Sequence, residues 1–288
     1  MKSLIINADD VGFSGPINEA VKACCLDGRI TGVSVMASGP CFKEAAEMLK
    51  EIGKKDVGVH LTLTGNSFPC AGDRSKVSTL VGSDGKFPAG YKTFAFRYFL
   101  GKIGAREVRL ELSAQIKRVL GEGLVVTHLD SHEHVHMFPE ILDLTIRLSK
   151  EFGVPYIRFP RESPGIILKR FSVKDFARYA SLAVFVSKGK GQITRAGVGR
   201  NDAFLGHFHA GRMDEGVFTF LLDRLSDGIN EVAVHPSTSS GDFFRECPWY
   251  RNAEKEFDFL MNGRWKGRLE AEGIRLVSHK EALESVER

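Results

Sequence analysis

The sequence predicts an α/β fold built on parallel strands, either a (β/α) barrel or an open doubly wound sheet. Strand-like and helix-like segments alternate seven times along the 288 residues, without a hairpin signal. This alternation favours parallel strands joined by right-handed crossovers. The polar residues best suited to chemistry follow several of the strands, as they do in folds whose sites form at the carboxyl ends of parallel strands.

The first half of the chain contains four strand and four helix patterns. Short apolar runs or strict alternation predict strands over 4–6, 30–37, 57–63 and 124–129. Apolar residues at helical spacing predict helices over 17–25, 42–52, 108–120 and 141–152. Ser14 is a suitable N-cap for the first helix, and Gly28 and Gly53 follow the ends of the first two. Residues 65–105 are expected to form a long connection.

The second half continues the alternation around one irregular segment. Strands are expected over 156–159, 231–235 and 274–278, and helices over 218–225, over 249–261 and at the carboxyl terminus. Residues 163–210 form a basic insert that also contains the apolar run SLAVFVS. It could lie on an anionic membrane surface or cover a lipid tail, or it could be a packed helix with a solvated basic face. The whole of 1–288 is expected to form one domain that includes this insert.

The bulk composition indicates an ordinary soluble protein. Hydrophobic residues make up 43% of the chain and charged residues 26%, with a net charge of +4. This charge, without a Lys/Arg-rich block, does not indicate a nucleic-acid partner. The amino terminus lacks a signal-peptide core and no stretch is long enough to span a membrane, so a cytoplasmic location is expected, with the inner face of the membrane as an alternative. Composition leaves the oligomeric state open, including a homo-oligomer.

Acidic and imidazole side chains follow the predicted strands at four places. Asp9 and Asp10 follow the first strand, His60 lies late in the third, Asp130 and His132 follow the fourth, and His235 ends a later one. Imidazole nitrogen with carboxylate oxygen, and no thiolate, suits zinc, manganese, iron, cobalt or nickel. Two histidines and one aspartate would leave positions open for water and substrate, as in a catalytic site. One of the adjacent aspartates could bind the metal while the other accepts a proton.

Each of these motifs also has a plainer interpretation. The Asp9–Asp10 pair alone would usually cap a helix or form a turn, and His60 alone would usually be a hydrogen-bonded core residue. The stretch THLDSHEHVHMFPE (127–140) could be a solvated loop, although it holds four of the nine histidines. His235 followed by proline is a common way for a strand to end. The four places together favour a metal site, with the ligand among His128, His132, His134 and His136 left open.

The same motifs resemble the YdjC-like carbohydrate deacetylases. NADDVGFS, GVHLTLTG, THLDSHEHVHMFPE and EVAVHPS resemble four motifs of that family, in the same order and over nearly the whole chain. Val11 stands where phenylalanine is usual, and Glu133 stands in place of a middle histidine. IRFPRES and FLGHFHAGRM look more like the hopanoid-associated branch than the chitooligosaccharide branch.

This resemblance implies an irregular, TIM-like (β/α) barrel of seven parallel strands and hydrolysis of N-acetyl groups from sugars. It implies Asp10, His60 and His132 as metal ligands and Asp9 as the proton acceptor. The family has been associated with magnesium, but two imidazole ligands favour zinc or another transition metal. The expected substrate is an N-acetylated amino sugar, oligosaccharide or glycolipid.

Further roles are expected for residues around these ligands. His235 would protonate the departing amine, Asp130 would orient an imidazole, and His136 would touch the substrate. Arg158 and Arg161 would hold a sugar hydroxyl or phosphate, or else form surface ion pairs. Trp249 and Tyr250 would stack on a sugar ring or pack in the core. The alternative functions are a metallophosphoesterase and a non-catalytic carbohydrate-binding protein on the same barrel.

Overall fold

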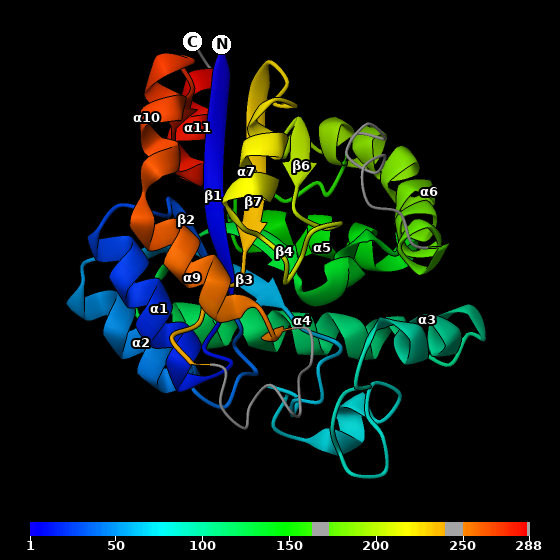
Figure 1. The fold of residues 1–288 in the computed structure, drawn as a ribbon. Coiled ribbons are helices and arrows are strands. Elements are labelled where there is room, and N and C mark those ends of the chain that lie inside the picture. Colours follow the sequence, from blue (N-terminus) through cyan, green and yellow to red (C-terminus); the bar gives the residue numbers. More distant parts are fainter. Residues whose placement is uncertain (163–172, 240–249, 287–288) are drawn as a thin grey trace.

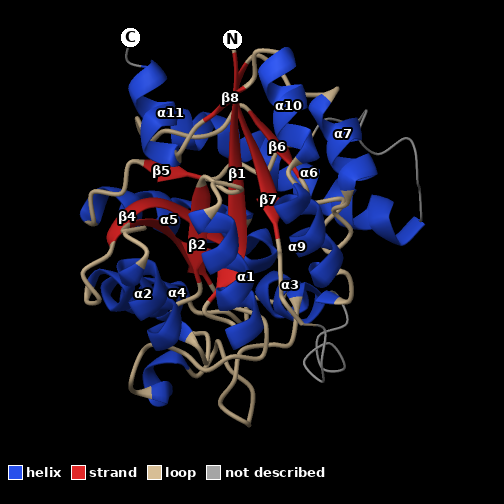
Figure 2. Cartoon of the chain, turned by 60° about the vertical axis from the view of Figure 1, so that its left-hand side comes forward, coloured by secondary structure: helices blue, strands red, loops and turns tan. Residues whose placement is uncertain are grey.

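The computed structural model describes residues 1–162, 173–239 and 250–286, which form one sheet of eight parallel strands surrounded by helices (Figures 1 and 2). The strands are β1 (Lys2–Val11), β2 (Gly32–Val35), β3 (Asp56–Leu61), β4 (Val125–Ser131), β5 (Tyr156–Ile157), β6 (Ala203–Leu205), β7 (Gly228–Val234) and β8 (Arg275–Leu276). The predicted α/β class with parallel strands is therefore confirmed.

Seven of the strands form one continuous path in the order β5-β4-β3-β2-β1-β7-β6. This path has the predicted number of seven strands, but they are not the same seven strands that the sequence predicts. β6 lies in the segment interpreted as an insert, and three residues are too few for a periodic signal. The predicted strand over 274–278 is the two-residue β8, which lies off the path and pairs with β1.

The sheet curls so that its two ends approach each other, as in an irregular TIM-like barrel. Tyr156 of β5 forms a parallel bridge with Gly199, shortly before β6. The amide of Phe204 in β6 donates to the carbonyl of Arg161 at 2.9 Å. β1 lies in the middle of the path, and its residues 3–11 are buried. Its carboxyl end therefore lies inside the curled sheet, where side chains from several strands can meet it.

The helices of the first half are α1 (Gly15–Leu26), α2 (Phe42–Glu51), η1 (Arg74–Val77), α3 (Tyr91–Phe99), α4 (Ala105–Leu120), η2 (His132–Met137) and α5 (Pro139–Glu151). Ser14 caps α1 as predicted, with its side chain accepting from the amide of Ile17. The helices α3 and η1 occupy the stretch predicted to be a long connection. α3 has no side-chain N-cap bond and is rich in aromatic residues, so its sequence carries only weak helix signals.

The helices of the second half are α6 (Val173–Arg195), α7 (Glu215–Leu222), α9 (Ala253–Asn262), α10 (Arg264–Ala271) and α11 (His279–Val286). About half of the predicted insert is thus α6, and its residues 163–172 lie outside the described part of the chain. α10 was not predicted. Across the described residues, no helix is both long enough and apolar enough to cross a bilayer.

Candidate metal centre

The two adjacent aspartates lie near the end of β1, where the strand is irregular. The pairing of β1 with β2 shifts register between Ala8 and Val11. Asp10 has a φ of 60°, a left-handed conformation that few non-glycine residues adopt. Strained backbone of this kind is concentrated at functional sites. The shift lets the side chains of Asp9 and Asp10 reach different partners.

Asp10, His60 and His132 come together from β1, from β3 and from η2, directly after β4. Oδ1 of Asp10 lies 3.1 Å from Nε2 of His60 and 2.9 Å from Nδ1 of His132. One ligand atom from each residue lies within 4.8 Å of the other two, so the three could hold one cation. Among the four histidines of residues 127–140, His132 is the one that reaches Asp10. These are the three residues that the family resemblance implies as metal ligands, and their role as ligands stays a prediction.

The charges at this centre favour an ionised carboxylate. Burial raises the pKa of Asp10, but the imidazoles of His132 and His60 outweigh it and hold that pKa well below its usual range. Burial lowers the pKa of His132, whereas Asp10 raises it, with a net upward shift. An ionised aspartate is the form that binds a cation.

His60 is oriented by Asp130. Nδ1 of His60 donates to Oδ1 of Asp130 at 2.9 Å, which leaves Nε2 facing Asp10. Oδ2 of Asp130 accepts from the hydroxyl of Ser34 at 2.7 Å, and the Asp130 side chain is fully buried. A carboxylate behind a histidine ligand fixes the ring and its tautomer in many metal sites. Asp130 thus lies where an imidazole-orienting residue is expected.

Asp9 does not face the three ligands freely, because Arg158 holds it. The guanidinium of Arg158 donates to both carboxylate oxygens of Asp9, at 2.6 and 2.7 Å. Asn7 adds a third hydrogen bond, from Nδ2 to Oδ1 of Asp9 at 2.7 Å. Burial raises the pKa of Asp9, but the charge and hydrogen bonds of Arg158 outweigh this and lower it to about 2. Asp9 is therefore ionised and fixed in place.

Arg158 was expected either to hold a sugar hydroxyl or phosphate or to form a surface ion pair, and both expectations are wrong. Its side chain is 0% exposed, so it neither touches substrate nor forms a surface ion pair. Besides Asp9 it contacts Oδ2 of Asp130 at 2.8 Å and Oε1 of Glu231 at 2.6 Å. A buried cation needs such partners to offset its desolvation. Arg158 is therefore the centre of a buried charge cluster beside the candidate metal ligands.

His235 lies at the end of β7 and keeps some contact with solvent. Its side chain is 18% exposed, and Nδ1 lies 4.0 Å from Oε2 of Glu256. The same Glu256 oxygen accepts from the backbone amide of His235 at 2.7 Å. Burial raises the pKa of Glu256 despite the nearby imidazole. His235 is thus anchored through its backbone while its ring stays near the surface of the site.

Three other predicted site residues have different outcomes. His136 is fully buried: Nε2 donates to the carbonyl of Arg158 at 2.9 Å and Nδ1 accepts from Ser131, so the prediction of a substrate contact is wrong. Burial lowers the pKa of His136 to about 4. Arg161 is exposed and lines a cavity of about 440 Å³ with Phe159, Leu182 and Lys190. Trp249 lies outside the described residues.

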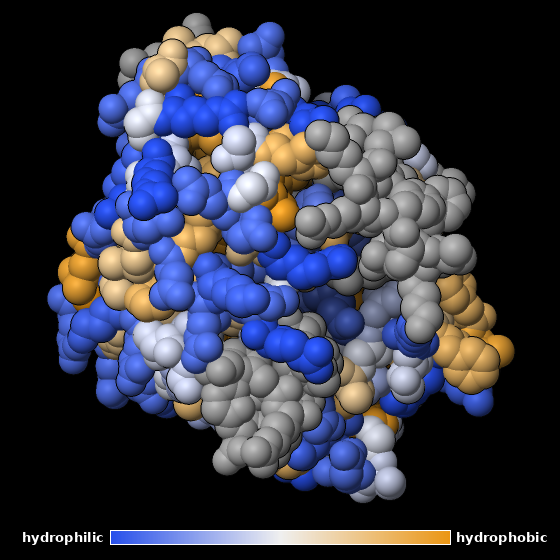
Figure 3. Space-filling model, in the orientation of Figure 1, coloured by the Kyte–Doolittle hydropathy of each residue, from blue (hydrophilic) through white to orange (hydrophobic). Residues whose placement is uncertain are grey.

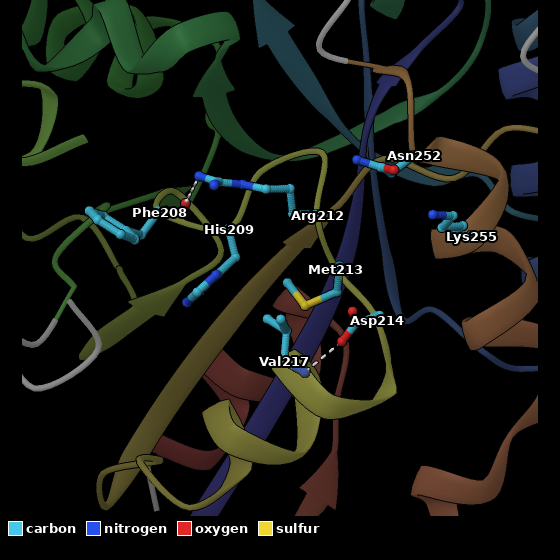
Figure 4. Close-up of a pocket in the computed structure, with 8 residues that line it drawn as sticks. All are labelled: Phe208, His209, Arg212, Met213, Asp214, Val217, Asn252 and Lys255. Carbon is cyan, nitrogen blue, oxygen red and sulfur yellow. Dashed lines mark hydrogen bonds between the residues drawn. The ribbon is translucent and has the colours of Figure 1, made fainter. Parts of the chain in front are cut away.

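A second cavity, of about 250 Å³, is lined by the loop after β6 and by the start of α9, and none of the three ligands lines it. Figure 4 shows Phe208, His209 and Arg212 of the loop after β6 on one side and Asn252 and Lys255 on the other. Met213 of the same loop donates its amide to Glu256 at 3.0 Å. Glu256 therefore joins this loop to the strand end that carries His235.

Residues 3–271 match the family model described as YdjC-like protein. The chain belongs to the YdjC-like family. A protein named carbohydrate deacetylase from Geobacillus stearothermophilus is 26% identical over 280 residues, which cover 96% of each chain. A Listeria welshimeri protein of the same name is 32% identical over 231 residues, covering 80% of this chain and 90% of that one.

The fold agrees with that of a solved structure. The chain superposes on a crystal structure of a candidate cellobiose-phosphate cleavage protein from Enterococcus faecalis with a TM-score of 0.77. The superposition covers 97% of this chain and 98% of the other at 24% identity, and it bears on the fold alone. The predicted YdjC-like resemblance is confirmed, while assignment to the hopanoid-associated branch stays a prediction.

Two residues of this YdjC-like site have contacts that the sequence did not predict. Tyr250, expected to stack on a sugar ring or to pack in the core, is buried, and its hydroxyl donates a hydrogen bond to Oδ2 of Asp10. Glu231 of β7 accepts from Arg158 and also from the hydroxyl of Tyr156 at 2.9 Å. The available signal for Glu231 was a charged residue within a mainly apolar, buried strand, GINEVAV. A buried charge at such a position needs a buried partner.

Proposed function

We propose that this chain hydrolyses the N-acetyl group of an amino sugar with the help of one divalent metal ion. The observation that carries the proposal is the convergence of Asp10, His60 and His132, with the ionised Asp9 next in sequence to one of these ligands. The names of the curated relatives support carbohydrate deacetylation as the reaction.

The donor set of the three ligands fits a divalent transition metal. Two imidazole nitrogens and one carboxylate oxygen favour zinc over magnesium, which prefers oxygen ligands in octahedral geometry. Three protein ligands leave room in the coordination sphere for other groups. A metal ion bound there would supply Lewis acidity, polarising the acetamide carbonyl and lowering the pKa of a water.

Asp9 is proposed as the acceptor of the water's proton. Its low pKa keeps the carboxylate ionised and so able to take up a proton, and it also makes Asp9 a weak base in the free protein. Arg158 holds both oxygens of this carboxylate, so that its orientation is set before substrate arrives. Positioning of this kind removes an entropic cost from the reaction. Arg158 acts through Asp9 and is therefore a positioning residue.

His235 is proposed as the donor of the proton to the departing amine. Its ring is partly exposed, and Nδ1 is near the buried carboxylate of Glu256. An imidazole can exchange protons near neutral pH. Protonation of the amine nitrogen is needed because the free amide anion is a poor leaving group. The products of the proposed reaction are acetate and a sugar with a free amino group.

The proposed substrates are N-acetylated sugars, oligosaccharides or glycolipids. The exposed Arg161 lines the larger cavity together with α6 residues of the 163–210 insert, and the rest of the substrate is proposed to occupy this cavity. We also propose that the enzyme is cytoplasmic. Its insert would then contact the inner face of the membrane or cover the lipid tail of a substrate.

Acetate release tests this proposal and separates it from its alternatives. Purified protein with zinc should release acetate from at least one N-acetylglucosamine-containing sugar, oligosaccharide or glycolipid. Asp9→Asn should lower that rate by about 100-fold or more, because the proton acceptor is lost. Phosphate release without acetate would indicate a metallophosphoesterase. Sugar binding without turnover would indicate a non-catalytic binding protein.

A further inference from the structure

The end of α3 presents large apolar side chains to solvent. Phe96 is 66% exposed, Phe99 65% and Leu100 51%. Phe99 and Leu100 follow Phe96 by three and four positions, so all three side chains lie on one side of the helix. The other face of α3 packs normally, with Tyr91, Phe94 and Tyr98 each contacting the ring of Phe138. Phe99 also approaches the ring of Phe138, with centroids 6.0 Å apart, yet most of its surface stays exposed, so the fold leaves this second apolar face largely uncovered.

The same surface continues onto α6. Phe99 stacks on Phe185 of α6 with ring centroids 6.1 Å apart, and the adjacent Val184 is 56% exposed. We call Phe96, Phe99, Leu100 and Val184 the α3–α6 patch. Figure 3 shows apolar surface at the right-hand edge of the molecule, where Figure 1 places the end of α3. Contiguous apolar surface of this kind usually marks a site of contact with a partner or a membrane.

The chain around the patch is positively charged. From Tyr91 to Arg106 it carries four basic residues, Lys92, Arg97, Lys102 and Arg106, and no acidic one. Three of these, Lys92, Lys102 and Arg106, are exposed and form no ion pair with any described residue. The acidic residue that follows this stretch, Glu107, accepts hydrogen bonds from the amide and hydroxyl of Thr79. Aromatic residues surrounded by unpaired cations match the chemistry of an anionic lipid surface.

We propose that the α3–α6 patch docks this protein onto anionic lipid bilayers. Phe96 and Phe99 would enter the interface between head groups and acyl chains, while Lys92, Lys102 and Arg106 would lie against acidic head groups. Contact of the patch with the same patch of a second copy is less favourable, because it would bring the two sets of cations together. The contact surface lies mainly on α3, outside the 163–210 insert.

The α3–α6 patch and the candidate metal centre lie toward opposite ends of α3. α3 begins next to Gly90, where an added Cβ would lie 3.5 Å from the carboxylate of Glu133, the neighbour of His132. From there Phe99 is about 14 Å along the helix, at 1.5 Å per residue. Docking would therefore hold the site close to the lipid surface. On the proposed function, this would suit a substrate anchored in that surface.

Co-sedimentation with vesicles tests the docking. The wild-type protein should sediment at low salt with phosphatidylglycerol-containing vesicles, more weakly with phosphatidylcholine alone, and less as salt rises. Phe96→Ser with Phe99→Ser should weaken the binding by about tenfold or more, since the buried aromatic area is lost. Leu26→Ser is the matched control, because Leu26 is 67% exposed on α1, well away from α3 in Figure 1. It should bind as the wild type does.

Three outcomes would overturn the proposal. The wild type could stay in the supernatant with phosphatidylglycerol vesicles, or the double variant could bind as tightly as Leu26→Ser. Light scattering could also show a wild-type dimer that the double variant dissociates while neither protein binds vesicles, which would assign the patch to self-association. Circular dichroism melting checks that each variant is folded. Acetate release from a soluble sugar should be the same in the double variant, so failure of docking and failure of the proposed function are distinguishable.

Discussion

Arg158 shows how single residues determine the chemistry of this site. Its guanidinium lies between carboxylates from three strands, Asp9 of β1, Asp130 of β4 and Glu231 of β7. Asp130 in turn orients His60, and Asp9 neighbours Asp10 in the chain. The buried cation thus fixes the carboxylates on which both the ligand geometry and the proton acceptor depend. Removal of any one of the carboxylates would leave part of a buried charge without compensation.

Asp130→Asn tests the orienting role at this scale. An asparagine keeps the shape of the side chain but cannot provide the charge that holds Nδ1–H of His60. Zinc affinity, measured by isothermal titration calorimetry, should fall by about 10- to 100-fold. Asp143→Asn is the matched control, because Asp143 is a half-exposed residue of α5 whose charge, among the described residues, pairs with Arg147 alone. Equal zinc affinity in the two variants would rule out the orienting role.

At the scale of elements, β2 and β3 make room for the polar interior through glycine. An added Cβ on Gly58 of β3 would lie 2.1 Å from Nε2 of His128 in β4. His128 is stacked on His279 with ring centroids 3.4 Å apart, and its Nε2 lies 3.1 Å from the hydroxyl of Ser34. The ring therefore has no free direction in which to move. The polar layer inside the sheet requires a residue without a side chain at this position.

Gly58→Ala should destabilise the protein by about 1–3 kcal/mol, because overpacking shifts His128 and its partners. The measurement is the free energy of unfolding from a urea titration. Gly267→Ala provides the comparison, since Gly267 lies in helix α10 with no atom within 4 Å of an added Cβ. That change should stabilise α10 by about 0.5–1 kcal/mol. A Gly58→Ala protein as stable as the wild type would show that the interior is looser than described.

Which elements could be predicted follows from how local their signals are. α1 follows from Ser14 and its apolar spacing, and β3 from its alternation, because both signals lie within the element. α3 and β6 could not be predicted, because α3 is aromatic on both faces and β6 is held mainly by β7. The burial of Arg158 had no local signal at all. It depends on carboxylates that lie between 28 and 149 positions away in the chain and meet only when the sheet curls.

At the scale of the whole molecule, the buried charges link stability to pH. His136 has a folded-state pKa of about 4 against 6.5 in the unfolded chain. The unfolded state therefore binds more protons between these values, and stability is lost as pH falls from 6.5 to 4. Glu231 has a folded-state pKa lowered from 4.5 to about 2, so its contribution is present above 4.5 and is lost as pH falls toward 2. The two groups act in adjoining pH ranges.

Urea titrations at a series of pH values measure this effect. The free energy of unfolding should fall by on the order of 3 kcal/mol between pH 6.5 and 4, from His136 alone. His136→Asn should make the decrease in that range smaller, with the remainder coming from His128, whose pKa burial also holds well below its usual range, while the decrease below pH 4.5 stays in place. A wild-type curve that is level from pH 6.5 to 4 would contradict the buried, neutral state of His136.

The most direct test of the account is an anomalous-scattering map from crystals grown with zinc. The map should show one zinc peak bonded to Asp10, His60 and His132, with imidazole nitrogens about 2.1 Å from the ion. Asp10→Asn crystals should lose that peak or show it weakened. A wild-type map with no ion between these three side chains, or with the zinc held by other residues, would contradict the account.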